Sequence, residues 1–139
     1  MLFIFGLGYL GKFIKDEALK LNINTYATKT SPNYKENILQ FNTDSIDKHI
    51  ISLLEQAEYV LITIPPINGE DIVANFIENN ITSMSKLKWL GYCSATSVYG
   101  DHEGDWVDES SELKGKDERA LARLNAEKKW LDLSDKYKL

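Results

Sequence analysis

The sequence predicts an α/β fold, a doubly wound parallel sheet with the strand order 3-2-1-4-5, and three observations support this prediction. A short apolar run, Leu2–Phe5, leads directly into closely spaced glycines and an amphipathic helix. Four further short strands alternate with helical segments, and such alternation builds parallel sheets with right-handed crossovers. The chain has 139 residues, enough for a single domain with a buried core.

The first strand and helix are joined by glycines at positions 6, 8 and 11, with the spacing G-x-G-x-x-G. In this motif the first glycine permits a tight turn, the second lets the backbone approach a pyrophosphate, and the third lets the helix pack closely on the strand. The free N–H groups at the start of the helix would hold the phosphates. The predicted dinucleotide-binding turn comprises Gly6, Leu7, Gly8, Tyr9, Leu10 and Gly11. The alternative is a tight turn that binds nothing.

The remaining elements are predicted from apolar periodicity and from turn and capping residues. Asp44 is expected to cap the second helix, and Pro65 and Pro66 to end the fourth strand. In order, we expect a strand over 23–28, a loop over 29–33, a strand over 38–41, a helix over 44–57, a strand over 59–64, a helix over 68–79, a strand over 88–94, an acidic loop over 101–116 and a helix over 117–136.

The composition argues against a nucleic-acid-binding protein and against a membrane-spanning one. A formal net charge of −5 argues against a nucleic-acid-binding surface, and no apolar segment approaches the length of a membrane span. Cys93 is the only cysteine, so we expect no disulfide framework and a reducing, cytoplasmic setting. His49 and His102 lie far apart in the sequence, and no metal site is expected.

Ligands of doubly wound sheets lie beyond the carboxyl ends of the strands, so the segments that follow the five strands should converge. An acid at the end of the second strand, which would bind the ribose of NAD, is missing. Lys29, with the hydroxyls of Thr28 and Thr30, would suit a 2′-phosphate. We therefore expect NADP, with NAD as the alternative; Lys29 could also be an ordinary solvated loop lysine. The other predicted cofactor contacts are Asp44, Ile64 and Pro65.

Three segments carry a resemblance to a known family: the glycine turn, Ser94–Gly100 (Ser-Ala-Thr-Ser-Val-Tyr-Gly) and Trp106–Glu109 (Trp-Val-Asp-Glu). Together they resemble the extended, atypical short-chain dehydrogenase/reductases, relatives of NAD(P)-dependent epimerases and dehydratases. The resemblance implies a Rossmann fold whose nicotinamide cofactor exchanges hydride with a sugar-like substrate or another small carbonyl or alcohol. It also implies that Asp44 contacts the adenine and that Thr96 and Tyr99 face the substrate.

The catalytic positions of that family are altered in this sequence. Its hydroxyl residue, tyrosine and lysine correspond to Ala95, Arg119 and Arg123. An alanine donates no hydrogen bond, and an arginine stays protonated. Thr96 could supply the hydroxyl after a small shift of the loop. The two arginines could bind phosphate or carboxylate, but we favour their pairing with neighbouring acids on an exposed helix face.

Family members continue past the last helix into a substrate-binding lobe that this sequence does not contain. Three hypotheses stay open: the cofactor-binding portion of an oxidoreductase or epimerase, a non-catalytic binding module, or the inactive remnant of a shortened gene. The fifth strand should lie at an unprotected sheet edge, and the last helix has two apolar stripes. We therefore expect a homodimer, or a complex with a chain that carries the missing half.

Overall fold

The computed structural model describes residues 1–137, which form a five-stranded parallel sheet with the predicted order β3-β2-β1-β4-β5. Neighbouring strands all pair in parallel; for example, Leu2 of β1 lies opposite Thr25 of β2 and Tyr59 of β4. The strands are β1 (Leu2–Phe5), β2 (Thr25–Lys29), β3 (Ile38–Gln40), β4 (Tyr59–Ile62) and β5 (Trp89–Tyr92). The predicted fold class and strand order are confirmed.

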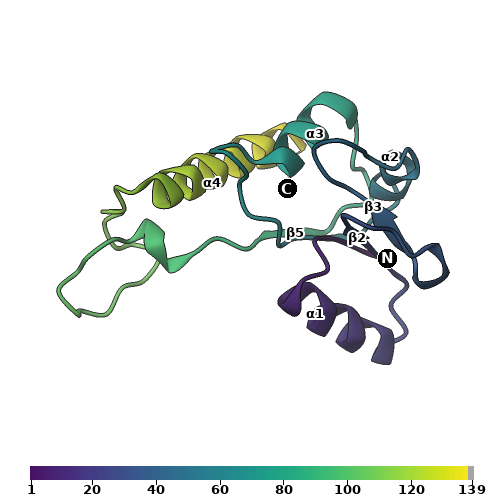
Figure 1. Ribbon diagram of the computed structural model, residues 1–139, viewed down its shortest axis with the longest axis horizontal. Helices are drawn as coiled ribbons and strands as arrows, with labels where there is room; N and C mark the ends of the chain where they lie inside the picture. The colour runs from purple at the N-terminus through teal and green to yellow at the C-terminus, as the bar shows by residue number, and fades with distance from the viewer. Residues whose placement is uncertain (138–139) are drawn as a thin grey trace.

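Helices cover the two faces of the sheet unequally (Figure 1). Helix α1 lies alone on one face, whereas α2, α3 and α4 lie on the other. The helices are α1 (Tyr9–Lys20), α2 (His49–Leu54), α3 (Ile72–Asn80) and α4 (Glu118–Tyr137), with two 3-10 turns, η1 (Tyr34–Glu36) and η2 (Thr96–Val98). No helix within residues 1–137 is both long enough and apolar enough to span a membrane.

The larger core lies on the three-helix face. Phe3 and Phe5 of β1 are fully buried there, and their ring centroids stand 5.0 Å apart. The Phe5 ring also contacts the Phe41 ring, which in turn contacts that of Phe76. On the other face Leu2 and Ile4 pack against Ala18 of α1. All four residues of β1 are buried because the strand is central and covered on both sides, which explains its continuous apolar sequence.

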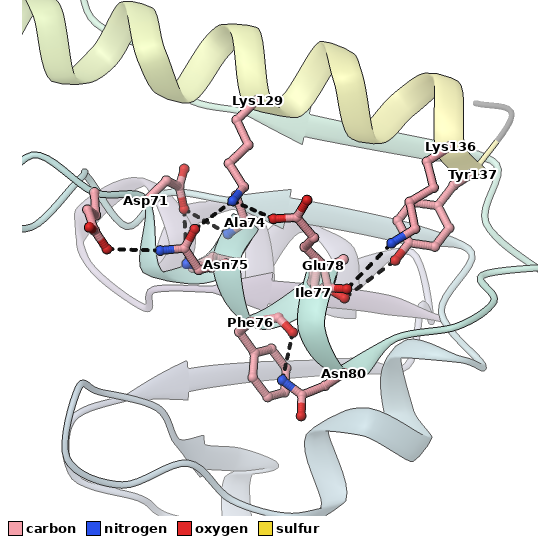
Figure 2. Close-up of polar contacts among 12 residues, drawn as sticks. Asp71, Ala74, Asn75, Phe76, Ile77, Glu78, Asn80, Lys129, Lys136 and Tyr137 are labelled. Carbon is pink, nitrogen blue, oxygen red and sulfur yellow. Dashed lines mark hydrogen bonds and ion pairs between the residues drawn. The ribbon is translucent and has the colours of Figure 1, made fainter.

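A polar network joins α3 to α4 (Figure 2). The Asp71 carboxylate caps α3 by accepting from the N–H groups of Val73 and Ala74, and it also accepts from the Trp130 indole at 2.8 Å. From α4, the Lys129 ammonium reaches Glu78 and Asn75, at 2.6 Å in each case. These contacts fix α4 on α3, and hence the start of α4 relative to the ends of β4 and β5.

Several predicted boundaries are wrong. The strands β3, β4 and β5 end one or two residues earlier than predicted, at Gln40, Ile62 and Tyr92, and β5 begins at Trp89 rather than at residue 88.

The starts of β2 and α3 are displaced by local turns. Strand β2 begins at Thr25 rather than residue 23, because the Ile23 N–H ends α1 by donating to Ala18, and Asn22 takes a left-handed conformation. This strand also includes Lys29, which was expected in a loop. Asn68 is left-handed too, so α3 begins at Ile72, after its Asp71 cap.

The second helix is shorter than predicted, and Asp44 does not cap it. The Asn42 side chain accepts from the N–H groups of Asp44 and Ser45, which folds residues 42–45 into a turn. Asp47 then accepts from the N–H of His49, and α2 begins there. Ile46, which lies within the predicted helix over 44–57, instead forms an isolated antiparallel bridge with Phe41 and is exposed.

Candidate functional site

The turn between β1 and α1 is held by two threonines. Gly6 has a φ of +94°, which L side chains rarely adopt. Its N–H donates to the Thr28 hydroxyl at 3.0 Å, and its carbonyl accepts from the Thr63 hydroxyl at 2.7 Å. A Cβ at Gly6 would stand 2.6 Å from the Thr63 oxygen. Hydrogen bonds from the ends of β2 and β4 therefore both hold this turn in place.

The other two glycines meet very different surroundings. A Cβ at Gly11 would lie 2.2 Å from the Gly6 carbonyl oxygen, so its absence lets α1 pack closely on the turn. A Cβ at Gly8 would meet no atom of the protein within 4 Å. Gly8 has a φ of −77°, which any residue adopts, so the fold itself does not require glycine there. The space beside it is open to a ligand.

The start of α1 has free hydrogen-bond donors. Its first helical bond runs from the N–H of Lys12 to the carbonyl of Gly8. The N–H groups of Tyr9, Leu10 and Gly11 thus have no helical acceptor, and no side chain caps this helix. In contrast, aspartates cap α3 and α4. Uncapped N–H groups beside open space, at the positive end of a helix dipole, suit an anionic group.

Thr28 and Lys29, at the end of β2, have different environments. Thr28 is fully buried and its hydroxyl is engaged with Gly6, so its predicted role as a phosphate ligand is replaced by a structural one. Lys29 is exposed, as is Thr30. Of the three residues predicted to bind a 2′-phosphate, only Lys29 and Thr30 are therefore accessible to a ligand.

The remaining predicted cofactor contacts also lie at the carboxyl edge of the sheet. Asp44 is exposed in the turn that follows β3, with its carboxylate near the Thr43 hydroxyl. Ile64 is half-buried and packs against the turn, since its Cγ1 would stand 2.9 Å from a Cβ at Gly6. Pro65 follows, exposed. The topology thus sets all of these segments along one edge, as predicted.

An open cleft of about 900 Å³ lies where β4 and β5 end and α4 begins. It contains the three altered positions, Ala95, Arg119 and Arg123, and also Ser97, which the sequence analysis did not select. The residues that line it are Pro65, Pro66, Asn68, Gly69, Ala95, Ser97, Asp117, Glu118, Arg119, Ala122 and Arg123. The cleft therefore adjoins the glycine turn through Ile64 and Pro65.

Arg123 is not paired with neighbouring acids, contrary to the interpretation favoured from the sequence. Its guanidinium donates to the Cys93 carbonyl at 2.7 Å and to the Tyr92 hydroxyl at 3.2 Å, and it lies over the Tyr92 ring. Burial raises the pKa of Tyr92, and the Arg123 hydrogen bond opposes that rise. Burial also raises the pKa of the Cys93 thiol, which keeps it protonated. Arg123 thus fastens α4 to the end of β5, while Arg119 is exposed at the mouth of the cleft.

The two predicted substrate-side residues lie in and just after η2. Thr96 is exposed and Tyr99 is half-buried. Among the described residues, the hydroxyl side chain lining the cleft belongs to Ser97 rather than to Thr96. Sequence position alone could have suggested Ser97, since it lies two residues after Ala95, but only the turn of η2 decides which hydroxyl reaches the cleft. Residues 1–137 contain no group of three His, Cys, Asp or Glu side chains that could hold a metal ion.

Comparisons with known proteins find solved structures with a similar fold. No family model and no curated protein match the sequence. A functionally unknown conserved protein from Silicibacter pomeroyi is 27% identical, with a TM-score of 0.77 over 93% of this chain and 47% of its own. A short-chain dehydrogenase/reductase superfamily protein from Agrobacterium tumefaciens with bound NAD gives a TM-score of 0.68 at 14% identity, over 94% of this chain and 44% of its own.

A UDP-N-acetylglucosamine 4-epimerase from Bacillus cereus also matches, with a TM-score of 0.68 at 18% identity over 99% of this chain and 56% of its own. The chain thus spans about half the length of the solved structures it matches. Over that half, the Rossmann-type fold is the one found in these dehydrogenase and epimerase structures.

Proposed function

We propose that this chain, with the fold of dinucleotide-dependent dehydrogenases and epimerases, is a nicotinamide-dinucleotide-binding unit of an oxidoreductase- or epimerase-like protein. The observation that carries the proposal is the open space beside Gly8 at the uncapped start of α1. Gly6 and Gly11 are required by the fold, but Gly8 is not. A glycine at a position where the protein leaves room for any side chain suits a ligand that approaches the backbone.

The residues along the sheet edge fit the parts of such a cofactor. The N–H groups of Tyr9, Leu10 and Gly11 would hold the pyrophosphate. Asp44 would contact the adenosine half, while Ile64 and Pro65 would flank the path toward the cleft. When bound, the nicotinamide supplies hydride transfer. The substrate, a small carbonyl, alcohol or sugar-type compound, would occupy the cleft lined by Ser97 and Arg119.

NADP fits the end of β2 better than NAD. No carboxylate ends that strand, whereas Lys29 stands there exposed beside Thr30. A lysine supplies a positive charge to a 2′-phosphate, which NAD lacks. One such interaction at an exposed site contributes ~1 kcal/mol, or about a five- to tenfold preference.

The side chains at the catalytic positions favour a second candidate, a module that binds the cofactor but catalyses no reaction. Ala95 supplies no hydroxyl, and the Arg123 guanidinium is already bound to Cys93 and Tyr92. An arginine cannot exchange a proton at a working pH. Cofactor binding without activity would then influence the stability or the affinity of a partner.

Calorimetric titration with NADPH and NADH tests the proposal. We expect NADPH to bind more tightly, and Lys29→Glu to reduce or invert the preference. Lys35→Glu, an equal charge change at an exposed position in η1, is the matched control and should leave the preference unchanged. Equal affinities would refute the preference for NADP, and failure of the folded chain to bind either compound would refute the function itself. Subsequent addition of sugar nucleotides to the chain loaded with NADP⁺ separates the two candidates, because only a catalytic chain transfers hydride from a sugar hydroxyl to NADP⁺ and so forms NADPH.

A further inference from the structure

The buried side of α1 includes a lysine. Gly11, Lys15 and Ala18 are the buried residues of this helix, and their spacing of four and three positions places them on one face. Lys15 is only 9% exposed, at a position where the helical pattern calls for an apolar residue. A charge on the core side of an element costs stability unless it has a partner or a function. The packing of α1 alone thus does not account for this lysine.

The hydrogen-bond partner of Lys15 is a neutral backbone group. Its ammonium donates to the Glu36 carbonyl at 2.9 Å, which joins α1 to the loop between β2 and β3. No ion pair within residues 1–137 includes Lys15. An ammonium has three N–H donors and a full charge, whereas one carbonyl oxygen satisfies one donor and does not neutralise the charge. Lys15 can therefore still bind an anionic group.

The loop that accepts this bond is folded back on β2. Asn33 and Ile38 close it with two backbone hydrogen bonds, at 2.9 and 3.0 Å. The Ala27 N–H, within β2, donates to the Asn37 carbonyl at 3.0 Å. These bonds fix the loop against β2, and with it the position of the Lys15 ammonium.

Lys15 and Lys29 lie on the same side of the sheet. Ala27 of β2 packs with Leu2 and Ile4 in the core on the α1 side. Because alternate side chains of a strand point to the same face, Lys29 is directed to the α1 side as well. Helical side chains lean toward the N-terminus of their helix, so the Lys15 side chain runs toward the edge of the sheet where β2 ends. An exposed and a buried positive charge thus lie on the α1 side of the end of β2.

The acidic side chains of α1 and of this loop do not bind Lys15. Glu17 is engaged by Lys20 at 2.6 Å, and the side chains of Asp16 and Glu36 are exposed. In the sheet order, β2 is separated from β4 and β5 by β1, and α4 lies on the opposite face (Figure 1). The elements that bury Lys15 are thus remote from the end of α4.

We propose that Lys15 is a second specificity-determining residue for the 2′-phosphate of NADP, an inference that rests on the function proposed above. Lys29 attracts this phosphate from the solvent side, and the Lys15 ammonium supplies a second charge from beneath the loop. A buried charge acts on a nearby phosphate more strongly than an exposed one, and salt screens it less. NAD has a hydroxyl in place of the phosphate and gains little from either lysine. Lys15 therefore contributes to the choice between the cofactors and not to binding of the parts that they share.

Calorimetric titration of Lys15→Met with NADPH and NADH tests the proposal, because this change keeps an unbranched side chain and removes the charge. We expect the affinity for NADPH to fall about tenfold and that for NADH to change less than about twofold. Lys15→Arg, which keeps the charge, should retain most of the preference for NADPH. Lys20→Met, at the exposed end of the same helix, is the matched control and should change neither affinity. Adenosine 2′,5′-bisphosphate and adenosine 5′-monophosphate should repeat the pattern, since they differ in this phosphate alone.

Lys29→Met measures the contribution of Lys15 without altering it, and this result stands even where Lys15→Met does not fold. This variant should keep about a threefold preference for NADPH that varies little between about 0.1 and 0.5 M salt. Loss of the whole preference in Lys29→Met would overturn the proposal. Folded Lys15→Met, checked by urea denaturation, would also overturn it by keeping the preference or by losing affinity for both cofactors equally, as a purely structural link between α1 and the loop would cause. Failure of the unchanged protein to bind either cofactor would instead refute the proposed function itself.

Discussion

Valine substitution at two glycines of the same turn should separate the requirements of the fold from those of the ligand. At Gly11, a Cβ would stand 2.2 Å from the Gly6 carbonyl oxygen and 3.3 Å from Ile4, against an ordinary contact of at least 3.4 Å. Helix α1 would have to move away from the turn by roughly 1 Å to lengthen the 2.2 Å approach to an ordinary contact of 3.4 Å. At Gly8 the added carbon meets nothing within 4 Å.

The expected costs follow from these contacts. Gly11→Val forces a branched side chain into a packed backbone contact, so we expect a loss of about 3 kcal/mol in the free energy of unfolding, the upper end of overpacking effects. Gly8→Val meets no clash and keeps an allowed φ, so its loss should stay within about 1 kcal/mol, the range of N-cap substitutions. The Gly8 variant should nevertheless bind neither NADPH nor NADH measurably, a loss of at least about 100-fold, because the isopropyl group occupies the space that a pyrophosphate needs.

The assays are urea denaturation for stability and calorimetric titration for binding, with both variants compared with the unchanged protein. Folded Gly8→Val that binds the cofactor normally would show that the glycine turn is only structural. Gly11→Val as stable as the unchanged protein would refute the reasoning from the close approach of α1.

Three further predictions concern the cleft and the helices behind it. The chain, given NADP⁺ and sugar nucleotides, should form neither NADPH in an absorbance assay nor an epimerised product by chromatography; steady turnover in either assay that survives Arg119→Ala and Arg123→Ala but is lost in Thr96→Ala or Ser97→Ala would refute this. Asp71→Ala should lower the free energy of unfolding by about 3 kcal/mol in urea, because α3 loses its cap and the buried Trp130 N–H loses its acceptor; a loss under about 1 kcal/mol would show that these bonds are replaced. The hydrogen bond from Lys129 lowers the pKa of Glu78, so this pair should stabilise the fold above the ordinary pKa of 4.5 and cease to do so as the pH falls through the lower folded pKa; Lys129→Met should remove that part of the acid sensitivity in pH-dependent melting.

The sequence by itself determined the order of the sheet and the existence of the glycine turn. Both rest on local signals: an apolar strand, then glycines, then a helix, repeated in alternation. The last helix was predicted to within one residue of its start, because Asp117 caps it within the same stretch of sequence. The carboxyl-edge rule then grouped the segments after the strands correctly without any knowledge of side-chain positions.

Only the tertiary structure decided what each side chain of the site does. Thr28 was predicted to face a phosphate, but the fold brings Gly6 to it across 22 positions and buries its hydroxyl. Arg123 had acids close in sequence, yet it binds Tyr92 and Cys93, which are some 30 positions away. The helix predicted from Asp44 begins at His49, because the Asn42 side chain competes for the backbone. The physical reason is the same in each case. Periodicity and spacing describe an element's own surface, whereas a hydrogen bond between distant segments exists only after the sheet has assembled.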